Sequence, residues 1–254
     1  IQLRQQLQAQ LDQARADGSG PGKGALRAWF RARDGAATLM IGGRHLGSGA
    51  GPEAAVSVRI DGREIERWTV GPSTPSFLKF IPLAPGTLTG SSPWCELEIQ
   101  AALSDGANTG IIAIDQFDLQ GAGAPMLGFA EGWQEPEYEP ARGISWRWAS
   151  EKAVLRTSPT DRDVELQIIG ESPRRYFDRP SRVTAMAGSA QLWSAEAGSD
   201  FAWSFRVPVA ALKATGGAIT IETDQFFRPA DRGQGADRRA LGLRIYRVML
   251  KPAS

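Results

Sequence analysis

Aromatic and charged residues gather in residues 128–148, which read GFAEGWQEPEYEPARGISWRW. Four rings fall within 16 positions of a chain that has only 8 Trp and 3 Tyr: Trp133, Tyr138, Trp146 and Trp148. On a β-strand, Trp146 and Trp148 point to one side and Arg147 to the other. Flat rings for the C–H faces of pyranoses, beside polar groups for their hydroxyls, are what a sugar-binding surface requires. The same rings also suit the core between two sheets, so both interpretations stay open.

Carboxylates are the second chemical resource of this segment. Four of them alternate with proline and aromatic residues: Glu131, Glu135, Glu137 and Glu139. A glycosidase places two carboxylates on opposite sides of a sugar, and the cluster permits that arrangement. Alternating Glu and Pro is usually a stiff, solvated approach to a strand. We expect Glu137 to join the four aromatic residues in a sugar-facing set.

A second segment, residues 223–250, is rich in both Arg and Asp and reads TDQFFRPADRGQGADRRALGLRIYRVML. The planar donor fork of arginine suits the hydroxyl and carboxylate groups of a glycan, so we expect Arg228 and Arg239 to be the polar partners of the aromatic set. The alternative is that the opposite charges pair and rigidify the loop, at about 0–1 kcal/mol per exposed pair. No cofactor is expected. A structural calcium stays open, although no local ladder of ligands specifies one.

The chain contains few residues that could support other catalytic chemistry. His45, the only histidine, lies in GGRHLGSG, a predicted solvated turn, and no Gly-x-Ser-x-Gly elbow accompanies it. Cys95, the only cysteine, is expected to be buried as a small apolar residue. These two residues are too few for a zinc site. A formal net charge of +1 gives no field to attract nucleic acid, which is not an expected partner, and no run of 18 apolar residues could span a membrane.

The elements that must position these residues occur twice in the sequence. The matched segments are LMIGG with LQIIG, VSVRIDG with VTAMAG, and ELEI with ITIE. The offset between the copies drifts slowly: it is 128 where Gly42 matches Gly170, and 122 where Ile99 matches Ile221. Solenoid and propeller repeats are about 20–50 residues long, so a repeat of this length is a duplicated domain.

The predicted fold class is all-β, with two tandem antiparallel β-sandwich (jelly-roll-like) domains and a short N-terminal helix. Strands of 6–8 residues alternate with turn signals such as Asp61-Gly62, which predicts a tight hairpin. Leu3, Leu7 and Leu11 form the apolar stripe of the predicted helix. The predicted parts are a helical connector and Gly-rich linker at 1–23, a first β-sandwich at 24–122 and a second at 123–254.

The second copy resembles the C-terminal tandem β-sandwich modules appended to bacterial membrane or surface-polysaccharide glycosyltransferases. The residues that carry the resemblance are Gly132-Trp133, Glu137, Trp146-Arg147-Trp148, Asp224, Phe226, Pro229-Ala230, Asp237, Arg239 and Leu241-Gly242-Leu243. The resemblance implies a jelly-roll, galactose-binding-like domain in an accessory role, with the catalytic domain elsewhere in the parent polypeptide. The first copy lacks the Trp-rich opening and the Arg-rich loop, so we expect any site in the second copy or at the seam between the two.

The expected function is therefore a non-catalytic carbohydrate-binding or positioning module. Its expected partners are a glycan or polysaccharide and an upstream catalytic or membrane domain of the parent chain, and its expected location is the bacterial cell envelope, periplasmic or extracellular. Two alternatives remain: a purely structural spacer or assembly pair of sandwiches, and a jelly-roll glycoside hydrolase or polysaccharide lyase. The exposure of Trp146 and Trp148 separates the first from a binding module, because buried rings cannot stack on a sugar.

Overall fold

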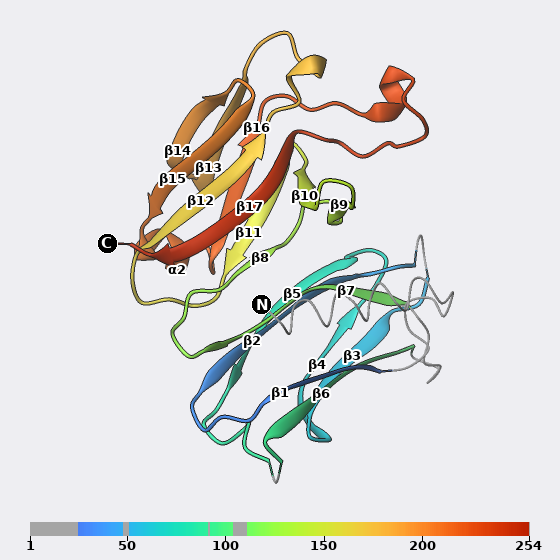
Figure 1. The fold of residues 1–254 in the computed structure, drawn as a ribbon, viewed down its shortest axis with the longest axis vertical. Helices are drawn as coiled ribbons and strands as arrows, with labels where there is room; N and C mark the ends of the chain where they lie inside the picture. Colours follow the sequence, from blue (N-terminus) through green and yellow to red (C-terminus); the bar gives the residue numbers. More distant parts are fainter. Residues whose placement is uncertain (1–24, 48–50, 91, 104–110, 254) are drawn as a thin grey trace. The chain divides into compact units, whose positions relative to one another are not determined.

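A computed structural model describes residues 25–47, 51–90, 92–103 and 111–253 (Figure 1). The chain divides into two compact units between Ala122 and Gly123. Each unit has two antiparallel sheets, which confirms the predicted all-β fold of two tandem sandwiches. The predicted N-terminal helix lies outside the described residues. Within the described ranges, no helix is both long and apolar enough to cross a membrane.

The first unit packs a four-stranded sheet, in the order β1–β6–β3–β4, against a three-stranded sheet, in the order β5–β2–β7. Its strands are β1 (Leu26–Arg31), β2 (Ala37–His45), β3 (Ala54–Ile60), β4 (Arg63–Val70), β5 (Ser76–Leu83), β6 (Trp94–Leu103) and β7 (Ile112–Gly121). Asp61 and Gly62 connect β3 to β4 with φ angles of 48° and 79°. These positive angles are those of a primed hairpin turn, as the Asp-Gly pair predicts.

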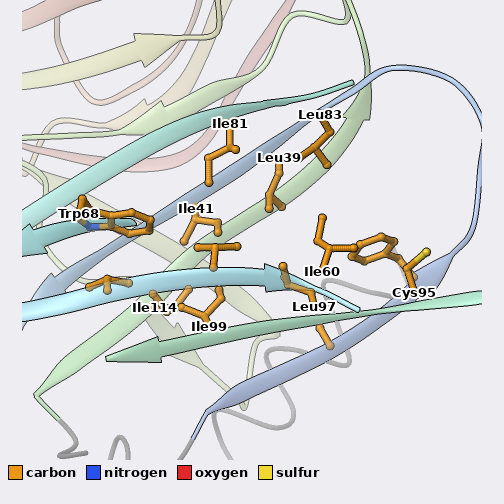
Figure 2. Packing of buried hydrophobic residues seen from close by; sticks show 14 of the residues in the cluster. Leu39, Ile41, Ile60, Trp68, Ile81, Leu83, Cys95, Leu97, Ile99 and Ile114 are labelled. Carbon is orange, nitrogen blue, oxygen red and sulfur yellow. The ribbon is translucent and has the colours of Figure 1, made fainter. Parts of the chain in front are cut away.

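Side chains from both sheets of the first unit interdigitate in one apolar core (Figure 2). Leu39 and Ile41 enter from β2, and Leu97 and Ile99 enter from β6, because every second residue of a strand faces the core. Cys95 lies in the same core, fully buried, which confirms the expectation from the sequence. Burial raises the pKa of its thiol, so the reactive thiolate form is disfavoured.

The second unit has two five-stranded sheets, in the orders β15–β12–β17–β10–β9 and β14–β13–β16–β11–β8. Its strands are β8 (Leu127–Phe129), β9 (Glu137–Glu139), β10 (Ile144–Ala149), β11 (Lys152–Thr157), β12 (Val164–Glu171), β13 (Ser181–Ala187), β14 (Ala190–Ala197), β15 (Asp200–Val207), β16 (Ala218–Thr223) and β17 (Leu243–Pro252). Three short helical segments join them: η1 (Arg174–Tyr176), α2 (Val209–Ala214) and η2 (Pro229–Arg232). A separate apolar core fills the space between these sheets.

The two units repeat one topology. The sheet orders β1–β6–β3–β4 and β5–β2–β7 recur as β11–β16–β13–β14 and β15–β12–β17. A β-bulge recurs as well, between Gly42 and Gly43 in the first unit and between Ile169 and Gly170 in the second. Gly170 is therefore the counterpart of Gly43, one residue later than the sequence match with Gly42 indicates. Among the described residues, the second unit has three additional strands, β8, β9 and β10. Three of the four Trp and Tyr residues of the segment 128–148 lie on them: Tyr138, Trp146 and Trp148.

His45 differs from its predicted place in a solvated turn. Its side chain is buried, with 3% exposure, at the end of β2. The ring nitrogen Nδ1 accepts a hydrogen bond from the Gly47 N–H at 3.0 Å, and Nε2 lies 3.1 Å from the carbonyl oxygen of Pro52. The histidine thus ties two stretches of backbone together. The sequence predicted a solvated His45 because the glycines of GGRHLGSG indicate a turn. The histidine instead ends a strand, where the exposure of its side chain depends on which backbone packs beside it.

Candidate functional site

Strand β10 places Trp146 and Trp148 on the outer face of the sheet β15–β12–β17–β10–β9. Ala149 is 1% exposed and faces the core, so alternation turns Trp148 and Trp146 away from it. Register puts Trp148 opposite Arg244 of β17, and puts Trp146 opposite Glu137 of β9. Both indoles are partly buried. The added strands therefore build a surface that has no counterpart in the described part of the first unit.

Glu137 connects Trp146 to the charged loop before β17. Its Oε2 accepts a hydrogen bond from the Trp146 indole N–H at 2.9 Å, and its Oε1 accepts one from Nη1 of Arg239 at 2.9 Å. Arg239 also donates two hydrogen bonds to Oδ2 of Asp237, from Nε at 3.0 Å and from Nη2 at 2.7 Å. These bonds lower the pKa of the Asp237 carboxyl and raise the pKa of Arg239. Two segments about 100 residues apart in sequence are thereby fixed to each other.

Arg244 covers one face of the Trp146 ring. Its guanidinium carbon lies 3.7 Å from the ring centroid, a cation–π contact, and 5.5 Å from the centroid of Tyr246. Its Nη1 bonds the Glu171 carboxylate of β12 at 3.0 Å. The Arg244 side chain is only 19% exposed, so this ion pair is better shielded from water than most surface pairs. Glu137 and Arg244 together hold Trp146 in one orientation.

Tyr246 occupies the extra position of the bulge in β17, next to Glu171. Burial, followed by a hydrogen bond to the Glu171 carboxylate, raises the pKa of Tyr246 to about 12. The neutral phenol is thus the form that the folded state favours.

We expect the second unit to lose stability in alkali through Tyr246. Because the pKa of Tyr246 is higher in the folded than in the unfolded chain, its neutral phenol stabilises the folded state. This contribution, on the order of 2 kcal/mol, is fully present below the unfolded-state pKa of about 10 and is lost as pH rises through the folded-state pKa. Ultraviolet titration of phenolate should show one transition near pH 12 that disappears in Tyr246→Phe. An unchanged titration curve in that variant would contradict the assignment.

Trp148 begins a chain of rings that reaches the two long loops of the second unit. It meets Phe227 edge to face at 6.0 Å, and Phe227 stacks on Tyr176 at 3.9 Å. The Tyr176 hydroxyl donates to Oε1 of Gln234 at 2.9 Å, which joins the loop that contains η1 to the loop that contains η2. Figure 1 shows both loops at the same end of this unit. The charged loop is therefore ordered by aromatic packing as well as by ion pairs.

The remaining residues of the predicted set are placed differently. Trp133 packs against the core, edge to face with Phe129 at 4.9 Å, and its indole N–H donates to the Val154 carbonyl oxygen at 2.9 Å. Tyr138 is 62% exposed and, by alternation along β9, faces away from Glu137. Arg228 is exposed, with its guanidinium 4.9 Å from the Phe226 centroid. The structure thus brings four predicted residues onto one face: Glu137, Trp146, Trp148 and Arg239.

Three residues of this face were not anticipated from the sequence: Glu171, Arg244 and Tyr246. Glu171 ends the strand pattern VELQIIGE, and Arg244 and Tyr246 lie within the pattern LGLRIYRVML. The alternation of Leu243, Arg244 and Ile245 contains the signal for Arg244, since a charged residue between two core residues must face outward. Tyr246 gives no such signal, because the bulge changes which side the following residues face.

The cluster of Glu137, Trp146, Trp148, Arg239 and Arg244, called the β10 face below, presents partly exposed rings beside fixed polar groups. Both oxygens of Glu137 are already engaged, by Trp146 and by Arg239. Across the described ranges, no three His, Cys, Asp or Glu side chains are grouped to hold a metal ion. The arrangement is suited to contact a ligand through ring faces and hydrogen bonds.

No family model and no curated protein matches this sequence. Among solved structures, the N-terminal CBM22-1-CBM22-2 tandem domain of Paenibacillus barcinonensis Xyn10C matches with 8% identity and a TM-score of 0.28, over 90% of this chain and 87% of that one. The M60 catalytic domain with the CBM51-1 and CBM51-2 domains of Clostridium perfringens ZmpB matches with 9% identity and a TM-score of 0.25, over 89% of this chain and 34% of that one. At such identities and TM-scores, neither likeness carries an argument about what this chain binds.

Proposed function

We propose that this chain is a non-catalytic carbohydrate-binding or positioning module whose glycan site is the β10 face of the second unit. One observation carries the proposal: strands that occur, among the described residues, in the second unit alone place two partly exposed indoles beside an ordered network of carboxylates and guanidinium groups. Rings for the C–H faces of a sugar, next to donors and acceptors for its hydroxyls, are the two parts of a sugar site.

Preorganisation is the physical advantage of this arrangement. Trp146 is held on its edge by Glu137 and on one ring face by Arg244, so it loses little rotamer freedom when a ligand arrives. The second ring, Trp148, is supported by Phe227. Arg239 keeps its planar donor fork in place through Asp237. A glycan lying along β10 would meet groups that are already in position.

The wider setting of the module is part of the same proposal. We place it as an accessory part of a bacterial glycosyltransferase or surface-polysaccharide system, in the periplasm or outside the cell, with the catalytic or membrane domain upstream in the parent chain. The motifs around Trp133, Trp146 and Arg239 support this placement through their resemblance to such modules. A structural calcium is not needed by the proposal.

A structural spacer is the second candidate, and the ring contacts favour it. Trp148, Phe227 and Tyr176 pack on one another, and Trp133 packs on the core, as they would in a domain whose aromatic residues only stabilise its loops. A hydrolase has weaker support, because the Glu137 carboxylate is held by two donors rather than facing an open cleft. A direct test of binding separates the spacer from the module.

Titration of the whole chain with bacterial exopolysaccharide fragments tests the proposal. We expect the indole N–H resonances of Trp146 and Trp148 to shift, together with tryptophan fluorescence, because a stacked sugar changes the environment of both rings. Trp146→Leu should weaken binding about tenfold, the loss of one good stacking contact. The control Trp203→Leu removes a core-packed indole from β15 of the same sheet, three strands from β10, and shows what a loss of stability alone does to binding. No response across a broad glycan panel would favour the spacer.

A further inference from the structure

Two tryptophans of the first unit stand out by their exposure. Trp29 on β1 is 47% exposed and Trp94 on β6 is 54% exposed. Ala28 and Cys95 face the core, so alternation turns both indoles to the outer face of the sheet β1–β6–β3–β4. Trp29 lies opposite Glu96, two residues from Trp94, which makes the indoles diagonal neighbours about 7–8 Å apart at their backbones. The two indoles therefore lie near each other on one face of the sheet.

These indoles differ from the other six in what they contact. The other six tryptophans stack on a ring, meet one at its edge or lie under a cation: Trp68, Trp133, Trp146, Trp148, Trp193 and Trp203. No such ring or cation contact engages Trp29 or Trp94 among the described residues. Large exposed apolar side chains that are grouped, rather than scattered, mark interaction sites. The pair is therefore a candidate surface for a ligand.

Charges beside the pair are already neutralised, with one exception. Arg27 bonds Glu98 at 2.9 Å, and Arg59 lies 3.6 Å from Glu98. Glu64 and Arg67 extend this ladder of alternating charges across the sheet. Arg31 lies directly opposite Trp94, is exposed, and has no ion-pair partner among the described residues. A ligand on this surface meets two ring faces and one unpaired guanidinium group.

The pair belongs to the first unit alone. The repeated register places Arg156 at the position of Trp29 and Gly216 at the position of Trp94. In the second unit, β8 also pairs along the outer edge of β11, whereas β1, the counterpart of β11, is the last strand of its sheet. Within the described residues, the first unit thus leaves open a sheet edge that β8 covers in the second unit.

We propose that Trp29, Trp94 and Arg31 form a second glycan site, for a polysaccharide that carries carboxylate groups. This site lies on the sheet β1–β6–β3–β4 of the first unit, whereas the β10 face belongs to the second unit. The proposal therefore rests on the proposed function, glycan binding, but adds a site that is separate from the β10 face. The indoles stack on successive sugar rings, and the fork of Arg31 binds a sugar carboxylate through paired hydrogen bonds. The neutral ladder next to them neither repels the acidic chain nor adds attraction.

Affinity electrophoresis of the whole chain tests this site, with alginate as the acidic probe and dextran as the neutral one. We expect alginate to retard the wild-type chain, and Trp29→Ala/Trp94→Ala to weaken that binding at least about tenfold. Arg31→Gln should weaken alginate binding several-fold at low salt and less at 1 M salt, because salt screens an exposed charge. The matched control Arg63→Gln removes an exposed charge from β4 of the same sheet and should bind alginate like the wild-type chain.

The outcomes separate this site from the β10 face. Loss of alginate binding in the double variant, with Trp146→Leu unaffected, supports a second site. Alginate binding that survives the double variant overturns it, and so does a wild-type chain that alginate does not retard. A dimer that dissociates in the double variant, seen by sedimentation, would instead identify the pair as a contact between copies. Thermal unfolding of each variant confirms that these exposed positions have not altered the fold.

Discussion

Replacing Gly170 by alanine is expected to lower the free energy of unfolding of the second unit by about 2–3 kcal/mol. A Cβ atom at this position would lie 2.5 Å from the Arg244 carbonyl oxygen and 2.9 Å from the Phe201 ring. The first neighbour is backbone of β17, so the strand itself must move away at the bulge. Hydrogen exchange should rise in β12 and β17, while β2 and β7 of the first unit stay protected.

Two further glycines make this experiment decisive. Gly198→Ala serves as the matched control, because a Cβ there meets nothing within 4 Å, and its stability should stay equal or rise slightly. Gly43→Ala is the reciprocal variant. Its Cβ would run into the Ala113 carbonyl oxygen, so the loss of protection should appear in the first unit instead. Equal stability of Gly170→Ala and Gly198→Ala would show that the bulge tolerates a side chain.

Replacing Arg244 by methionine is expected to have the second large effect, on both stability and binding. Methionine fills much of the volume but leaves the Glu171 carboxylate without its cation and Trp146 without its stacked guanidinium group. We expect the free energy of unfolding to fall by about 1–3 kcal/mol, as for other broken hydrogen bonds to a charged group. Glycan affinity at the β10 face should fall about tenfold, because Trp146 is no longer fixed.

A small set of variants separates these two contributions. Arg244→Met combined with Glu171→Gln should recover part of the stability, since no unpaired charge remains, without recovering glycan affinity. Arg244→Lys keeps the charge but not the planar stack, so we expect it to retain stability better than affinity. Arg247→Met, an exposed position three residues further along β17, is the matched control. Full glycan affinity in Arg244→Met would show that the contact of Arg244 with the Trp146 ring does not contribute to binding.

The asymmetry between the two units differs from the one that the sequence indicates. The aromatic opening and the Arg-rich loop direct attention to the second copy, and the structure does gather Glu137, Trp146 and Arg239 there. The first unit lacks the Trp-rich opening and the Arg-rich loop in its sequence. It nevertheless carries the two most exposed indoles of the described chain, Trp29 and Trp94. Their strands, LRAWFRAR and PWCELEI, look like ordinary alternating strands because each contains only one tryptophan.

The sequence by itself determined what depends on neighbours along the chain. Alternation of apolar and polar residues identified the strands, the Asp61-Gly62 turn followed from its φ requirements, and the internal match revealed a duplicated domain. Even the face of Trp146 and Trp148 on their strand follows from a period of two. All of these are local or repeated signals, and local geometry is sufficient to produce them.

Tertiary structure decided which of these residues meet. Trp133 and Trp146 are alike in sequence, yet one packs on the core and the other lies under Arg244. The contact from Arg239 to Glu137 depends on strand order and register, which are set by long-range backbone pairing and a single bulge. A shift of one residue in register turns every side chain of a strand to the opposite face, so no local pattern could fix these partners.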